Sequence, residues 1–154
     1  MSTLEVRIVQ LDPMRVAAAH GFGESPEGIA FQKIEAFAAS KGLLQEGKLS
    51  QTFGFNNPNP SHGSPNYGYE VWLPLDGDVE PEGDIEIKDI PGNLYAVARC
   101  HGLNNIGEIW SQLAMWREGS KYKHGNHQWL EHLLTPVDVP LEAYIFDLYL
   151  PITE

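Results

Sequence analysis

The chain has 154 residues, of which 42% are hydrophobic and 10% aromatic, a size and composition typical of one compact domain. Its formal net charge is −11, from 10 Lys and Arg against 21 Asp and Glu. Such a surface repels nucleic-acid phosphates and anionic lipid, so we expect neither direct nucleic-acid binding nor a membrane partner. It attracts cations, although acidity alone also keeps a protein in solution.

Cys100 is the only cysteine, so no internal disulfide can form. The chain has no apolar N-terminal signal segment and no run of about 20 apolar residues that could span a bilayer. These features predict a protein of the reducing cytoplasm. The histidines follow no HExxH or Cys/His spacing, so we expect no metal site and no cofactor.

The first half of the chain predicts two strands, a helix and two further strands. Alternating apolar residues mark the first strand, small residues mark the second, and a loop rich in Pro and Asn separates the last two. We expect these strands over residues 4–11, 15–22, 51–55 and 67–75. Ser25 is placed to cap a helix that begins with Pro26 and runs to Ser40, and Gly42 is a natural stop.

The second half repeats this order of elements. Its strands are expected over residues 84–90, 94–101, 127–134 and 143–151. Asn105 is placed to cap a helix that runs to about Trp116. The acidic, Gly/Pro-rich segment 76–84 is expected to join the halves 1–77 and 84–154.

Corresponding motifs support a duplication. His20-Gly21 and His101-Gly102 each end the second strand of their half, and segment 69–75 is expected to correspond to segment 129–136. Two copies of a unit of about 80 residues are too long a repeat for a solenoid. The sequence therefore predicts an α+β fold made of duplicated β-β-α-β-β units with pseudo-two-fold symmetry. Antiparallel sheets, one main helix per half and a ligand cleft between the halves complete this expectation.

Each half places a carboxylate beside an indole on a strand, as Glu70 with Trp72 and as Glu131 with Trp129. Residues two apart on a strand share one face. A lipophilic cation needs aromatic rings, at roughly 0.5–2 kcal/mol per contact, and a carboxylate to balance its charge. Desolvation in the empty site is expected to raise the pKa of that carboxylate. The alternative is a solvated Glu70 beside an indole that covers the edge of the core.

Three further positions bear on the site. Alternation in the last strand turns Asp147 and Tyr149 away from the apolar face, toward solvent or a groove. Trp110 is the first residue of an apolar stripe along the predicted helix. Its side chain is expected either to pack in the core or to face the expected cleft. Cys100 and His101 are adjacent on a strand, so they point to opposite faces and cannot form a catalytic dyad. We expect Cys100 to be a buried structural thiol.

Five segments, taken in chain order, carry a resemblance to a known family. They are FGFNNPNPS (53–61), YGYEVW (67–72), YAVARCHG (95–102), QWLEHLL (128–134) and FDLYLPI (146–152). The chain resembles the GyrI-like effector-binding family, whose members include the ligand-binding domains of BmrR-type and AraC-type regulators. Within that family it is most similar to stand-alone, integron-associated effector-binding proteins of bacteria.

The resemblance implies multidrug binding in a cleft between two β-α-β-β units. It also implies that a buried glutamate on the penultimate strand, here Glu131, recognises cationic aromatic drugs. The candidate ligand-binding residues are Glu131, Trp110, Trp72, Tyr69, Tyr149, Trp129, Glu70 and Phe55. Because this chain shows no DNA-binding or coiled-coil segment, we expect its relation to transcription regulation to be indirect.

The sequence and the resemblance leave three functions open. The first is a receptor for a small lipophilic, cationic or aromatic ligand. The second is a hydrolase of electrophilic, cyclopropane-bearing toxins, in which Glu131 is the catalytic residue. The third is interaction with a separate protein partner, as the resemblance to gyrase-inhibiting family members implies.

Overall fold

A computed structural model describes residues 4–44, 49, 52–57, 63–135 and 139–154. The chain forms two compact units. The middle unit is Met14–Ile90, and the terminal unit combines Met1–Pro13 with Pro91–Glu154. Among the described residues, no helix has the length and apolar character that a bilayer crossing requires.

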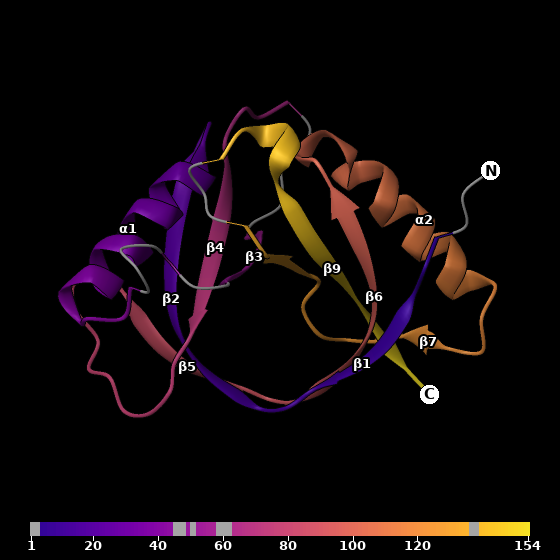
Figure 1. Cartoon of the computed structure of the whole chain (residues 1–154), viewed down its shortest axis with the longest axis horizontal. Coiled ribbons are helices and arrows are strands. Elements are labelled where there is room, and N and C mark those ends of the chain that lie inside the picture. The colour runs from indigo at the N-terminus through magenta and orange to yellow at the C-terminus, as the bar shows by residue number, and fades with distance from the viewer. Residues whose placement is uncertain (1–3, 45–48, 50–51, 58–62, 136–138) are drawn as a thin grey trace. The chain divides into compact units, whose positions relative to one another are not determined.

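The middle unit packs one helix on a four-stranded antiparallel sheet (Figure 1). Its strands pair in the order β3-β4-β2-β5. In chain order the elements are β2 (Met14–Gly23), α1 (Pro26–Ser40), β3 (Thr52–Asn56), β4 (Tyr67–Pro74) and β5 (Glu86–Ile90).

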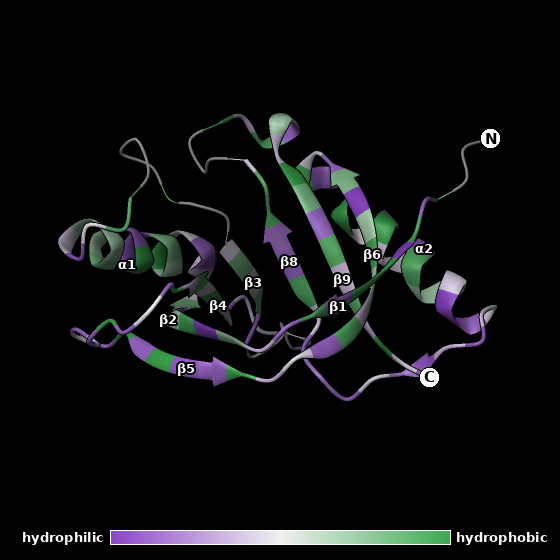
Figure 2. Cartoon of the chain, turned by 60° about the horizontal axis from the view of Figure 1, so that its bottom comes forward, coloured by the Kyte–Doolittle hydropathy of each residue, from purple (hydrophilic) through white to green (hydrophobic). Residues whose placement is uncertain are grey.

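The terminal unit has the same plan, with strands in the order β8-β9-β6-β1 and a short strand, β7, paired with β9. Hydrophilic and hydrophobic residues alternate along its strand β9, as they do along β5 of the middle unit (Figure 2). In chain order the elements are β1 (Arg7–Leu11), β6 (Asn93–His101), the 3-10 turn η1 (Leu103–Asn105), α2 (Ile106–Glu118), β7 (Lys123–His124), β8 (Leu130–Leu133), the 3-10 turn η2 (Leu141–Ala143) and β9 (Ile145–Thr153). The predicted α+β fold with duplicated antiparallel units is confirmed.

The two units do not coincide with the two halves predicted from the sequence. β1 pairs with β6 and β5 pairs with β2, so each half gives its first strand to the other unit. The chain passes from one unit to the other after Pro13 and again after Ile90. Segment 76–84, expected to link the halves, lies inside the middle unit.

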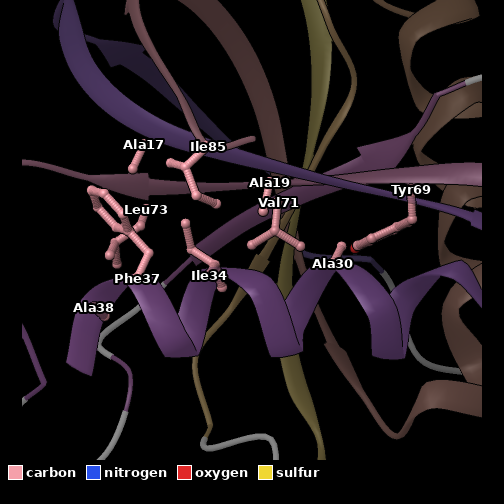
Figure 3. Close-up of a cluster of buried hydrophobic side chains, with 10 residues drawn as sticks. All are labelled: Ala17, Ala19, Ala30, Ile34, Phe37, Ala38, Tyr69, Val71, Leu73 and Ile85. Carbon is pink, nitrogen blue, oxygen red and sulfur yellow. The ribbon is translucent and has the colours of Figure 1, made fainter. Parts of the chain in front are cut away.

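The core of the middle unit lies between α1 and one face of the sheet (Figure 3). Small residues on β2 let the helix approach closely: a Cβ on Gly21 would lie 2.3 Å from the carbonyl oxygen of Pro26. Ile34 is fully buried there, and burial of such a side chain contributes about 1.5–3 kcal/mol. The cluster contains Ala17, Ala19, Ala30, Ile34, Phe37, Ala38, Tyr69, Val71, Leu73 and Ile85.

In the terminal unit, α2 packs on β6 and β9. Leu113 of α2 and Leu148 of β9 are fully buried. Cys100 is buried as expected, and burial, followed by the negative charge of Glu131, raises the pKa of its thiol. Arg117 is also buried and donates to the carbonyl oxygen of Pro151 at 3.0 Å.

The helix ends differ in detail from the sequence-based expectation. Neither Ser25 nor Asn105 makes a side-chain cap hydrogen bond. The Asn105 amide instead donates to the carbonyl oxygen of His101 at 2.7 Å, because the 3-10 turn η1 separates β6 from α2. Gly42 has φ of 70°, a left-handed conformation that suits glycine after a helix. Residues 51, 58–62 and 136 of the predicted segments lie outside the described residues.

Candidate functional site

The strand registers align the two units residue by residue. β4 contains the segment EVWLP and β9 the segment DLYLP. The proline of β4 pairs with the first of four consecutive buried residues on β2, and the proline of β9 pairs with the first of four on β6. The alignment makes Glu70 equivalent to Asp147 and Trp72 equivalent to Tyr149. Each unit therefore carries one buried carboxylate at the same place in its sheet, and both residues are 5% exposed.

The predicted correspondence between segments 69–75 and 129–136 is wrong. β8 pairs with β9 as β3 pairs with β4, so β8 is the equivalent of β3. Glu131 lies opposite Leu148, at the place that Gly54 takes in the middle unit. The false match arose because both segments contain one glutamate and one tryptophan, whereas the equivalent segment of β9 has aspartate and tyrosine.

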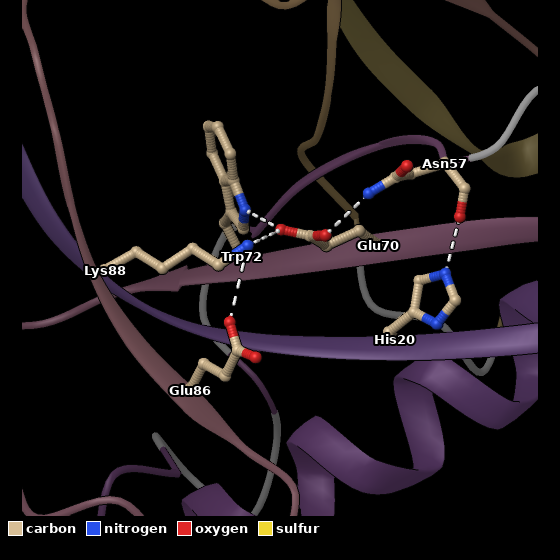
Figure 4. Close-up of polar contacts among 6 residues, drawn as sticks. All are labelled: His20, Asn57, Glu70, Trp72, Glu86 and Lys88. Atoms are coloured by element: carbon tan, nitrogen blue, oxygen red, sulfur yellow. Dashed lines mark hydrogen bonds and ion pairs between the residues drawn. The ribbon is translucent and has the colours of Figure 1, made fainter.

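Three donors converge on the Glu70 carboxylate (Figure 4). Oε2 accepts hydrogen bonds from Trp72 Nε1 at 2.6 Å and from Lys88 Nζ at 2.9 Å. Oε1 accepts one from Asn57 Nδ2 at 3.0 Å. An indole, an amide and an ammonium group, each from a different segment, thus fix both carboxylate oxygens.

The pKa of Glu70 is lower than its ordinary value. Burial alone would raise it, but the hydrogen bonds from Lys88, Trp72 and Asn57 and the charge of Lys88 outweigh burial. The sequence-based expectation of a raised pKa from desolvation therefore fails at Glu70, because desolvation was considered without these donors. Glu70 is a carboxylate that stays ionised at neutral pH.

Backbone contacts hold Asn57 in place. Its N–H donates to the carbonyl oxygen of Gly68 at 2.8 Å, and its own carbonyl oxygen accepts a hydrogen bond from the ring of His20. A Cβ on Gly68 would lie 1.9 Å from that same oxygen. The absence of a side chain at Gly68 is what allows Asn57 to come close enough to orient Glu70.

A cavity of about 360 Å³ in the middle unit adjoins these groups. The acidic residues Glu70, Asp84 and Glu86 and the basic residue Lys88 are among those that line it. Lys33 pairs with Asp84 at 2.7 Å. Because the acidic residues outnumber these two lysines, the surroundings of the cavity are acidic. It is lined by Ala18, Ala19, His20, Asn57, Glu70, Asp84, Glu86 and Lys88.

The aromatic side chains near Glu70 are packed rather than exposed in this cavity. Trp72 and Phe55 are both buried, and their rings meet edge to face with centroids 4.9 Å apart. Phe55 pairs with Glu70 across β3 and β4, so it shares the sheet face of Glu70 and Trp72. Tyr69 lies on the opposite face, in the core under α1.

Asp147 is neutralised differently. It accepts hydrogen bonds from Arg99 at 2.8 and 3.2 Å and from Arg7 at 2.9 Å. Burial would raise its pKa, but the two guanidinium groups hold it below the ordinary value. From the sequence, Asp147 was expected to face either solvent or a groove. In the structure it is buried between two arginines.

Glu131 belongs to a second group, on the α2 side of the terminal sheet. It is half-buried, and Trp129 contacts Trp110 of α2 with ring centroids 5.2 Å apart. The guanidinium of Arg117 lies 5.8 Å from the centre of the Trp129 ring. Tyr149 lies on the other face of the sheet, with its ring 5.3 Å from that of Tyr95.

The predicted ligand-binding residues thus fall into separate groups within the units. Phe55, Glu70 and Trp72 share one face of the middle sheet, and Trp110, Trp129 and Glu131 lie together in the terminal unit. Asn57, Lys88 and Glu86 were not predicted from the sequence. The alternation of segment 84–90 puts Lys88 and Glu86 on one face, but only the strand pairing shows that this face includes Glu70. No group of His, Cys, Asp or Glu among the described residues could hold a metal ion.

A comparison with family models identifies the family of this chain. The family model for integron-associated effector binding proteins (Cass2) matches residues 7–152, and the chain belongs to that family. Members of such a family bind small molecules, which makes ligand binding the biochemical class of this protein. A comparison with curated protein sequences found no match.

Solved structures of low sequence identity share the fold. The C-terminal domain of EcmrR is 11% identical, with a TM-score of 0.69 and coverage of 99% of both chains. In the EcmrR–DNA complex, this chain spans only 57% of the EcmrR chain. The integron cassette protein VCH_CASS2 of Vibrio cholerae is 12% identical, with a TM-score of 0.55 and coverage of 96% and 95%.

Two further structures are described with a ligand or an activity. SAV2435, solved bound to tetraphenylphosphonium, is 13% identical, with a TM-score of 0.57 and coverage of 97% of this chain and 94% of that one. A hydrolase encoded by lin2189 of Listeria innocua is 11% identical, with a TM-score of 0.68 and coverage of 97% and 92%.

Proposed function

We propose that this protein binds a small organic cation and that Glu70 is the carboxylate that recognises its charge. One observation carries the proposal: Glu70 is 5% exposed, yet it lines a cavity of about 360 Å³ together with Asp84 and Glu86. A buried carboxylate is costly unless a cation accompanies it, and here that cation is Lys88, a part-exposed lysine that a ligand can replace. The volume lies at the lower end of the range for small-molecule pockets.

Lipophilic aromatic cations are the first ligand class to test. The tetraphenylphosphonium complex of SAV2435 supports this choice. Trp72 and Phe55 share the sheet face of Glu70, but their rings pack on each other and do not line the cavity, so an aromatic cation would meet mainly the carboxylate. The family match over residues 7–152 supports one effector-binding domain to which both units contribute. The net charge of −11 supports a function of this domain without direct contact to nucleic acid.

Glu131 is the second candidate for the recognition carboxylate. The family resemblance implies it, and the contact between Trp129 and Trp110 supplies indole rings beside it. Against it stands Arg117, whose guanidinium is already 5.8 Å from the Trp129 ring. A ligand cation at Trp129 would have to share that ring with a buried arginine, so we rank Glu131 below Glu70.

Hydrolysis is the second candidate function, because the Listeria innocua hydrolase has the same fold. A general acid needs a pKa near the working pH. The lowered pKa of Glu70 does not suit that role, so a hydrolase would use Glu131. Mass spectrometry of cyclopropane-bearing electrophiles incubated with wild type and Glu131→Gln tests this function. Recovery of unchanged compounds alone excludes it for that panel.

Isothermal titration calorimetry tests the binding proposal. Tetraphenylphosphonium and the smaller benzyltrimethylammonium are titrated into wild type, Glu70→Gln and Glu131→Gln, with tetraphenylborate as the anion of matching shape. We expect cation binding to weaken at least about tenfold in Glu70→Gln and to change little in Glu131→Gln, and we expect no binding of the anion. Equal cation affinity in wild type and Glu70→Gln contradicts the proposal.

A further inference from the structure

Lys88 is the only one of the three Glu70 donors that carries a charge. Its Nζ lies 2.9 Å from Glu70 Oε2, although it belongs to β5 and Glu70 to β4, with β2 between them. The Lys88 side chain is 35% exposed, against 6% for that of Glu70. A lysine ammonium on a flexible stem at the wall of a cavity can leave its partner without unfolding the sheet.

A second carboxylate is within reach of Lys88. Glu86 lies two residues earlier on β5, on the same face, and its Oε2 is 3.7 Å from Lys88 Nζ (Figure 4). The Glu86 side chain is 71% exposed. Lys88 can therefore transfer its ion pair from the buried carboxylate to one in solvent by a small side-chain movement.

Glu70 would remain oriented after Lys88 left. Trp72 Nε1 would still donate to Oε2 and Asn57 Nδ2 to Oε1, and both of these groups are neutral. The carboxylate would keep its position but lose the only positive charge that contacts it in the described part of the chain. Such a site favours a replacement cation over an empty state, because an unpaired buried charge is strongly unfavourable.

The equivalent carboxylate in the terminal unit lacks this freedom. Asp147 is held by Arg99 through two hydrogen bonds and by Arg7 through another. The planar guanidinium group fixes such a pair geometrically in a way that an ammonium group does not. The register places Val9 where the middle unit has Lys88, and Arg7 where it has Glu86. The movable lysine and its second carboxylate are therefore features of the Glu70 site alone.

We propose that Lys88 is an internal competitor for the cation site. Its ammonium group occupies Glu70 in the absence of ligand, and an organic cation binds by displacing it toward Glu86. This inference rests on the proposed function of Glu70. It predicts that the wild-type protein binds cations more weakly than its own carboxylate would allow, so that ligands unable to displace an ammonium group are rejected.

A double-mutant cycle with Lys88→Met and Glu86→Gln tests the proposal, with tetraphenylphosphonium titrated by calorimetry. Lys88→Met should bind at least about tenfold more tightly than wild type, because a charge-assisted hydrogen bond no longer has to be broken. Glu86→Gln should weaken binding in the wild-type background, where displaced Lys88 loses its second partner, and have a smaller effect when Lys88 is methionine. Lys121→Met gives the same change in net charge outside the cavity and should alter affinity less than about twofold.

Two results would overturn the role of Lys88: no gain in affinity for Lys88→Met, or an equal effect of Glu86→Gln in both backgrounds. The second result would mean that Lys88 stays in place while Glu86 acts only through its charge. Should Lys88→Met fail to fold, Lys88→Gln serves the same comparison. Failure of the proposed function looks different, because then Glu70→Gln binds the cation as well as wild type does.

Discussion

Glu70 and Asp147 occupy equivalent positions in the two units, but their charges are balanced by different groups. Glu70 is balanced by one lysine, with neutral donors from Asn57 and Trp72, and Asp147 by two arginines. Both residues are 5% exposed. Duplication thus produced two buried carboxylates. The arginine-bound one suits a structural role, and the lysine-bound one suits a site whose counter-ion can be exchanged.

The structural role of Asp147 predicts a loss of stability without a loss of binding. Asp147→Asn keeps the shape of the side chain but removes the charge that holds Arg7 and Arg99. We expect a decrease of roughly 2 kcal/mol in the free energy of unfolding, measured by urea denaturation, and unchanged affinity for tetraphenylphosphonium. A variant as stable as wild type would show that the two ion pairs contribute nothing.

Acid should remove this contribution in wild type. Because folding lowers the pKa of Asp147 below 3.8, its stabilising effect is complete above the pKa of the unfolded chain and disappears as the pH falls through the lower folded value. The difference in unfolding free energy between wild type and Asp147→Asn should therefore shrink below about pH 4. Urea denaturation curves of both proteins at a series of pH values measure this difference in unfolding free energy. If the difference grew on acidification, the ionised state of Asp147 would be contradicted.

Lys88 should control the ionisation of Glu70. It makes the largest contribution that lowers the pKa of Glu70, and burial opposes that contribution. In Lys88→Met we expect the pKa of Glu70 to rise. The chemical shift of the Glu70 side-chain carboxyl carbon, followed in an NMR titration, measures this pKa. Cation binding should then be lost at higher pH in the variant than in wild type. An unchanged titration midpoint would mean that Lys88 does not contact Glu70 in solution.

Gly68 should be intolerant of any side chain. In Gly68→Ala the new Cβ would lie 1.9 Å from the backbone oxygen of Asn57, so Asn57 must move and its hydrogen bond to Glu70 must break. We expect a loss of roughly 1–3 kcal/mol in stability together with weaker cation binding.

Gly28→Ala is the matched control for Gly68→Ala. Its Cβ meets nothing within 4 Å in the helix α1, so the substitution should stabilise the protein by about 0.5–1 kcal/mol. Equal thermal stability of the two variants would contradict the close approach of Asn57 to Gly68.

Local patterns in the sequence sufficed to predict most elements of both units. Proline at the start of α1, glycine after it and alternation in the strands are short-range signals, and they located the main elements to within a few residues. The exchange of β1 and β5 between the units could not be predicted in this way. Either pairing buries the same faces of these strands, so the alternation of residues does not distinguish them.

The candidate site depended on that missing information. Pairing Glu70 with Trp72 by spacing was correct, because residues two apart on a strand share a face. The lysine that neutralises Glu70 comes from β5, and only the order of strands brings β5 next to β2. Glu131 was proposed because the family resemblance implies it and because Glu131 and Trp129 repeat the residue types of Glu70 and Trp72. The residues that the strand register makes equivalent to that pair are Asp147 and Tyr149, which differ from it in type.

Recognition of a cation by the Glu70 carboxylate is the central proposal for this protein. The most direct measurement follows the side-chain carboxyl carbons of Glu70 and Glu131 by NMR as tetraphenylphosphonium is added to the isotope-labelled protein at neutral pH. We predict a saturable shift of the Glu70 signal with little change at Glu131. A saturable shift at Glu131 while Glu70 stays constant would contradict the account and place recognition in the terminal unit.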